Sequence, residues 1–65
     1  MTLKEFTETN VFEVADKIEY YDDETCEKLI FPNSKKERDK FYNREVVSHG
    51  TMVMNGIATL EVYLK

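Results

Sequence analysis

A chain of 65 residues has room for one domain, spanning residues 1–65. Its 13 acidic and nine basic side chains give a formal net charge of −4, so we do not expect direct binding to nucleic acid, which requires clustered lysine and arginine. No segment approaches the roughly 20 apolar residues of a membrane span, and one cysteine permits no internal disulfide; these features predict a cytoplasmic protein.

The first predicted element begins near the N-terminus. Thr2 and Glu5 have the spacing of a capping box, in which each side chain accepts a hydrogen bond from the backbone N–H of the other residue. Leu3 and Phe6 would then lie on one face of a helix. The pattern predicts a short helix over about residues 2–9.

The stretch 11–21 fits two periodicities. Apolar residues at helical spacing are Val11, Val14, Ala15 and Ile18. Residues that fit strand alternation are Phe12, Val14, Ile18 and Tyr20, with Asp16 as the exception. We favour a strand with a bulge near Asp16, and the choice between strand and helix for residues 11–17 stays open.

An acidic turn at residues 22–25 separates two β-prone runs, residues 18–21 and 26–31, which predicts a hairpin. Pro32 would end the second strand because it lacks a backbone N–H. Tyrosines beside carboxylates resemble a protein-recognition surface, although burial of one tyrosine in the core is an equal alternative. The candidate partner-binding residues are Tyr20, Tyr21, Asp22, Asp23 and Glu24.

Ser34 and Glu37 repeat the capping-box spacing and predict a second helix that runs to about Tyr42. The middle of this segment, residues 35–40, is mostly charged, whereas Phe41 and Tyr42 supply bulk at its end. We therefore expect a surface helix that is held by its last turn.

Asn55-Gly56 is the strongest local signal, because this dipeptide supplies the two positive-φ residues of a type I′ turn. If Met54 and Ile57 close the hairpin, the numbers of any two residues that face each other across the two strands add up to 111. The predicted core side then holds Val47, His49, Thr51, Val53, Ala58, Leu60, Val62 and Leu64. The other side holds Val46, Ser48, Met52, Met54, Ile57, Thr59, Glu61 and Tyr63.

The second side of this hairpin is too apolar for a solvated sheet face. Its apolar and aromatic members form a predicted interface: Val46, Met52, Met54, Ile57 and Tyr63. A homodimer is the commonest outcome for such a patch, and cover by one of the predicted helices is the alternative. All elements together predict an α+β fold: a small antiparallel sheet of about four strands, built as two hairpins, with two short helices.

No recognisable catalytic or metal-binding arrangement occurs in the sequence. His49 has no serine or aspartate at a catalytic spacing, and Cys26 lies among carboxylates that disfavour a reactive thiolate. The acidic turn lacks the spacing, the glycine and the terminal glutamate of a calcium loop. We therefore predict that the protein is not an enzyme and requires no metal and no cofactor.

Residues 2–6, 18–31 and 43–46 together resemble small uncharacterised prophage proteins of Gram-positive bacteria. The resemblance implies an origin in a phage or another mobile element. Short acidic phage proteins are often inhibitors of host defence proteins, anti-CRISPR proteins among them, so by analogy we expect a phage-type inhibitor that works in the host cytoplasm. Such a protein-binding module would act by steric block or through an acidic surface. The residues leave one alternative, an oligomer that binds a small molecule or a nucleotide between its subunits.

Overall fold

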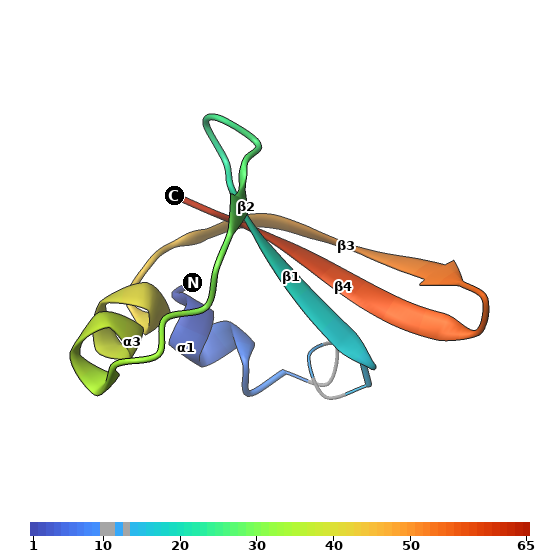
Figure 1. Cartoon of the computed structure of the whole chain (residues 1–65), viewed down its shortest axis with the longest axis horizontal. Coiled ribbons are helices and arrows are strands. Elements are labelled where there is room, and N and C mark those ends of the chain that lie inside the picture. Colours follow the sequence, from blue (N-terminus) through green and yellow to red (C-terminus); the bar gives the residue numbers. More distant parts are fainter. Residues whose placement is uncertain (10–11, 13) are drawn as a thin grey trace.

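The computed structural model describes residues 1–9, 12 and 14–65. Its elements are α1 (Leu3–Phe6), β1 (Lys17–Asp22), β2 (Lys28–Leu29), α3 (Lys35–Tyr42), β3 (Val46–Met54) and β4 (Ile57–Leu64). Figure 1 shows a twisted sheet whose two helices lie together near one end of the molecule. The structure confirms an α+β fold with four strands and two short helices among the described residues. None of these helices is long and apolar enough to cross a membrane.

The strand order is β2-β1-β4-β3. Each hairpin is antiparallel as predicted, but β1 runs parallel to β4, from Lys17 opposite Thr59 to Asp22 opposite Leu64. The sheet is therefore mixed, and the prediction of a purely antiparallel sheet is wrong on this point. The reason is the connection through α3, which carries the chain back to the end of the sheet where β2 begins. β3 then runs in the direction of β2, and β4 returns parallel to β1.

The capping box of α1 is formed as predicted, with Thr2 and Glu5 bonded through both side chains. The helix ends at Phe6, shorter than expected. β1 begins only at Lys17, so the strand prediction is wrong for residues 12 and 14–16, while residues 10, 11 and 13 lie outside the described part. Asp16 explains the late start: its N–H donates to the Ala58 carbonyl at 2.9 Å, and its carboxylate accepts from the Ala58 N–H at 3.0 Å. These two bonds fix Asp16 beside Ala58 of β4. The predicted bulge near Asp16 is therefore not formed.

α3 begins where the sequence predicts. The Ser34 hydroxyl accepts a hydrogen bond from the Glu37 N–H at 3.2 Å, and the helix runs to Tyr42. Phe41 is the buried residue of this helix, and most of its charged middle is exposed. The helix is thus anchored by its last turn, as expected for a charged surface helix.

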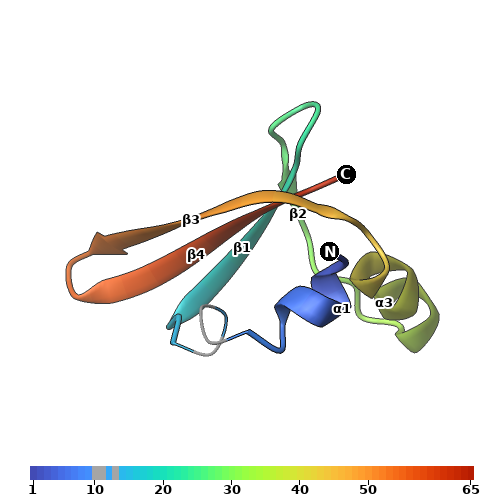
Figure 2. The same ribbon diagram turned by 180° about the vertical axis from the view of Figure 1, so that it is seen from behind.

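The core lies between the helices and one face of the sheet. Figures 1 and 2 show both helices on the same side of the strands. The buried residues are Leu3, Phe6, Tyr20, Phe41, Leu60, Val62 and Leu64. The alternation of burial along β4 at positions 60, 62 and 64 confirms that part of the predicted core side. Each such side chain contributes about 1.5–3 kcal/mol through removal from water.

The β3–β4 register follows the predicted sum from Met54 opposite Ile57 to Ser48 opposite Tyr63. Asn55 and Gly56 have φ values of 54° and 79°, as a type I′ turn requires. The register then shifts, so that Val46 lies opposite Leu64 and Val47 is an extra, exposed residue. The predicted Val47–Leu64 pair is therefore wrong.

The shift has a cause at the N-terminus. The Val46 N–H donates to the Met1 carbonyl at 2.8 Å, and the Leu3 N–H donates to the Arg44 carbonyl at 2.9 Å. These bonds hold residues 44–46 in place while the Asn-Gly turn fixes the other end of β3. The extra residue is absorbed between the two as a β-bulge, a common way to accommodate one surplus residue in a strand.

Candidate functional site

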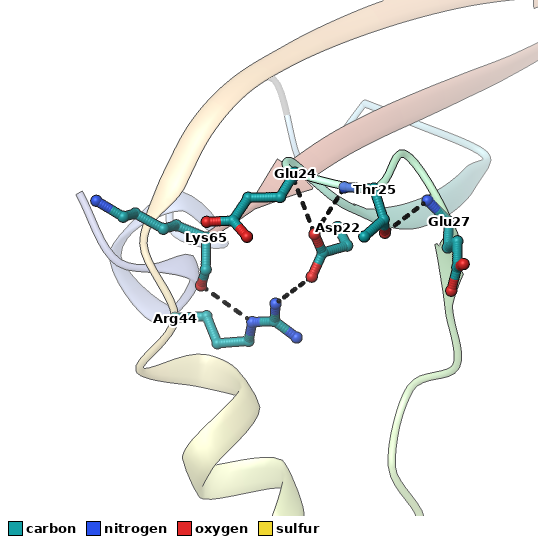
Figure 3. A network of polar contacts seen from close by, with 6 residues as sticks. All are labelled: Asp22, Glu24, Thr25, Glu27, Arg44 and Lys65. Atoms are coloured by element: carbon teal, nitrogen blue, oxygen red, sulfur yellow. Dashed lines mark hydrogen bonds and ion pairs between the residues drawn. The ribbon is translucent and has the colours of Figure 1, made fainter.

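The acidic turn between β1 and β2 is held by its own side chains (Figure 3). One carboxylate oxygen of Asp22 accepts the backbone N–H groups of Glu24 and Thr25, at 2.9 and 3.1 Å. The other oxygen lies 3.3 Å from the Arg44 guanidinium, which also donates to the Lys65 carbonyl at 3.2 Å. The two backbone N–H groups, and after them Arg44, lower the pKa of Asp22 below its ordinary value. Asp22 therefore stabilises the turn and has little capacity left for a partner.

The two candidate tyrosines lie on opposite faces of β1. Tyr20 is buried, with its ring edge-on to Phe41 at 5.1 Å, so the core alternative holds for this residue. Tyr21 is half-buried on the sheet face opposite the helices, which we call the open face. Its ring stacks on Tyr63 at 5.3 Å, and its hydroxyl donates a hydrogen bond to Glu19 at 3.2 Å. Burial raises the pKa of both phenols. Of the five predicted partner-binding residues, Asp23 and Glu24 are the two that the fold leaves exposed.

The open sheet face around Tyr21 is electrostatically balanced. Glu19 lies 3.0 Å from the Lys28 ammonium and 3.6 Å from that of Lys17. The hydrogen bond from Lys28 is the main cause that lowers the pKa of Glu19. Charges neutralised within one face offer little attraction to a partner, so this region is a weak candidate for recognition.

A different surface lies at the far end of the β3–β4 hairpin. Met52, Val53, Met54 and Ile57 are 44, 71, 62 and 51% exposed, and we call these four residues the hairpin patch. Met52, Met54 and Ile57 lie on one face of the hairpin, and Val53 lies on the opposite face. Figure 1 shows this end of the hairpin projecting away from α3. No charged residue occurs between Glu45 and Glu61, so all 13 acidic and nine basic side chains of the chain lie outside this stretch. The hairpin patch is thus apolar, exposed and uncharged, the combination that marks an interaction surface.

The structure brings three of the five predicted interface residues together in this patch: Met52, Met54 and Ile57. Val46 is turned toward the core by the bulge, and Tyr63 is stacked on Tyr21. Val53 was assigned to the core side by alternation, yet it is exposed. Burial along β4 begins only at Leu60. Strand alternation alone does not show where the covered part of the sheet ends.

β3 is also an edge strand. In a two-residue hairpin the pair that closes the turn exchanges both backbone hydrogen bonds, and the bonded pairs then alternate. Ser48, Gly50, Met52 and Met54 therefore direct their backbone groups toward β4. His49, Thr51 and Val53 direct theirs outward, where no described strand pairs with them.

Two hollows adjoin these elements. One, of about 280 Å³, lies beside the start of β3 and is lined in part by Phe6, Val47 and His49, with the His49 ring 4.8 Å from Phe6. The other, of about 530 Å³, lies between α1 and α3. Its lining is Lys4, Thr7, Glu8, Asp39, Tyr42 and Asn43. Small-molecule sites are mostly apolar with few polar groups, so the many polar and charged residues around this second hollow do not favour a small-molecule site there.

Among the described residues, no group of three or more histidine, cysteine or acidic side chains is arranged to hold a metal ion. Comparison of the chain with protein-family models, curated proteins and solved structures found no significant match. The candidate site therefore rests on the geometry of the hairpin patch.

Proposed function

We propose that this chain is a protein-binding module that docks its hairpin patch on an apolar surface of another protein. The observation that supports the proposal is the exposure of Met52, Val53, Met54 and Ile57 on a stretch without charge. Leaving such side chains in water forgoes the free energy that their burial would contribute. Methionine suits this role because its flexible thioether adapts to the shape of a partner.

Charge defines the second feature of the partner. The net charge of −4 arises entirely outside the uncharged stretch, and Asp23 and Glu24 are among its exposed contributors. A partner whose apolar surface is bordered by lysine and arginine would be attracted by this field before contact. The partner we propose is therefore a protein with an apolar, basic-rimmed surface.

The finer role is that of a phage-type inhibitor of a host defence protein. An inhibitor of this size acts by covering the functional surface of its target, and a projecting apolar hairpin is suited to fill a cleft there. The resemblance in residues 2–6, 18–31 and 43–46 supports this role, and the acidic body supports a target that handles nucleic acid, because such proteins carry basic surfaces.

Site-directed photo-crosslinking tests the docking surface. A photo-reactive amino acid at Met54 should capture the partner in host cells, whereas the same group at the exposed Lys36 of α3 should not. With the captured protein purified, Met54→Ser should weaken binding by at least about tenfold, the effect of 1.4 kcal/mol. Lys36→Ser should leave affinity unchanged. Capture from Lys36 alone, or unchanged affinity of the Met54 variant with an intact fold, would refute the proposal.

A further inference from the structure

The outer edge of β3 lacks the features that normally protect an edge strand. Natural sheets guard their edges with charged residues, proline, short strands or a cover. β3 has nine residues and contains no charged residue and no proline. Met1 occupies the edge only at Val46, and the bulge ends at Ser48. The edge from Ser48 to Met54 is therefore free for pairing among the described residues.

We infer that this edge pairs with β3 of a second copy, antiparallel and about a two-fold axis at Thr51. Thr51 is the midpoint of the free stretch from Ser48 to Met54. In this register Met54 lies opposite Ser48 of the second copy. The Asn55-Gly56 turn of one copy then lies next to the point where Met1 and Thr2 of the other copy begin to cover the edge. In this register the whole free stretch of each copy is paired.

Backbone directions agree with this register. His49, Thr51 and Val53 direct their N–H and C=O groups outward, and these are the residues that a two-fold axis at Thr51 pairs with one another. Thr51 would lie opposite its own copy, a pair that stabilises sheets. Met52 would lie opposite Gly50, where no atom stands within 4 Å of an added Cβ. The open space above Gly50 would accept the Met52 side chain of the second copy.

The charge distribution is compatible with a second copy as the occupant. Two chains of net charge −4 repel each other over most of their surfaces. The stretch between Glu45 and Glu61 is the uncharged part, so pairing through β3 keeps every charged side chain outside the strand contact. A chain of 65 residues without a disulfide also gains from the additional burial.

A two-fold axis normal to the sheet would join the two four-stranded sheets into one and place both open faces on the same side. Met54 and Ile57 of each copy would remain accessible on this face. The dimer would therefore present Met54 and Ile57 of both copies to a partner.

Charge pairs at Thr51 test the register. Thr51→Asp alone and Thr51→Lys alone would each place like charges opposite each other at the axis, which destabilises a sheet pair. We expect the wild type to sediment at micromolar concentration with twice its 7.7 kDa mass, each variant to sediment as a monomer, and an equimolar mixture of the two to recover the dimer. A loss of folding in one variant would not be repaired by mixing, so recovery is specific to this contact.

A second variant tests the backbone bonds. Thr51→Pro removes an outward N–H but leaves the bonds between β3 and β4 in place, because proline is tolerated on an edge. It should be a folded monomer by circular dichroism and sedimentation, while Thr51→Val should stay dimeric. A monomeric wild type, or a dimer unaffected by the single charges, would overturn the inference. The photo-crosslinking result at Met54 would stand in either case, which separates this failure from that of the proposed function.

Discussion

The two hairpins of this sheet are stabilised in different ways. The β1–β2 hairpin has a strand of two residues, Lys28–Leu29, and its turn is held by Asp22 and Arg44. The β3–β4 hairpin has long strands and a turn whose geometry comes from Asn55 and Gly56 alone. One turn uses charge to fold, and the other contains none.

This difference shows how charge should be interpreted in a small domain. The acidic turn resembles a recognition site in the sequence. Its first carboxylate, that of Asp22, is already bonded to two backbone N–H groups and to Arg44. The uncharged hairpin carries the group of four exposed apolar side chains that forms the hairpin patch. In this chain the absence of charge marks the candidate binding surface more clearly than its presence does.

The largest expected effect is a difference in stability loss when one leucine of each hairpin is truncated. Leu60 in β4 is fully buried, whereas Leu29 in β2 is half-buried. Leu60→Ala should lower the free energy of unfolding by about 2–5 kcal/mol, since it removes core contacts and leaves a cavity. Leu29→Ala should cost clearly less. Urea unfolding followed by circular dichroism checks this order, and an equal loss in both variants would contradict the difference between the hairpins.

The turn of β3–β4 provides the next effect. Gly56 has a φ of 79°, which a β-branched residue strongly disfavours. Gly56→Val should destabilise the protein by about 1–3 kcal/mol. Gly56→Asn is the matched control, because asparagine tolerates this conformation and should cost less. If both variants melt at the wild-type temperature, the turn does not fix the register of β3 and β4.

The smallest expected effect concerns acid and the turn of β1–β2. The folded pKa of Asp22 lies below its ordinary value of 3.8, so its stabilisation is present above that value and is lost as pH falls through the folded pKa. Below about pH 4 the melting temperature of Asp22→Asn should therefore fall less with decreasing pH than that of the wild type. Asp23→Asn is the control, because the neighbouring Asp23 is exposed. A wild-type acid profile in Asp22→Asn would show that this carboxylate does not stabilise the turn.

Local chemistry explains which parts of the fold were predictable. Both helix caps, the acidic turn and the Asn55-Gly56 turn depend on residues close in sequence, and each was predicted. The parallel pairing of β1 with β4 joins segments about 40 residues apart and depends on the route through α3. The bulge at Val47 depends on bonds from Met1 and Leu3 to residues 44–46. No local pattern contains either feature.

The candidate site was predictable to a similar degree. Alternation from the turn placed Met52, Met54 and Ile57 on one face without reference to the rest of the chain. It gave no information on how far the helices reach, so Val53 was assigned to the core. Tyr20 and Tyr21 differ by one position, and strand alternation separates them only after the covered face is known.

The parallel pairing of β1 with β4 also sets the order in which the sheet can assemble. β1 pairs with Thr59–Leu64, so it has to wait for β4, the last of the four described strands to be synthesised. The β3–β4 hairpin is local and can form early, whereas the central pair closes a long loop and should limit the folding rate. During synthesis β1 and β2 therefore emerge without their partner strand. A chain released before β4 would lack Leu60, Val62 and Leu64, and with them the middle of its core.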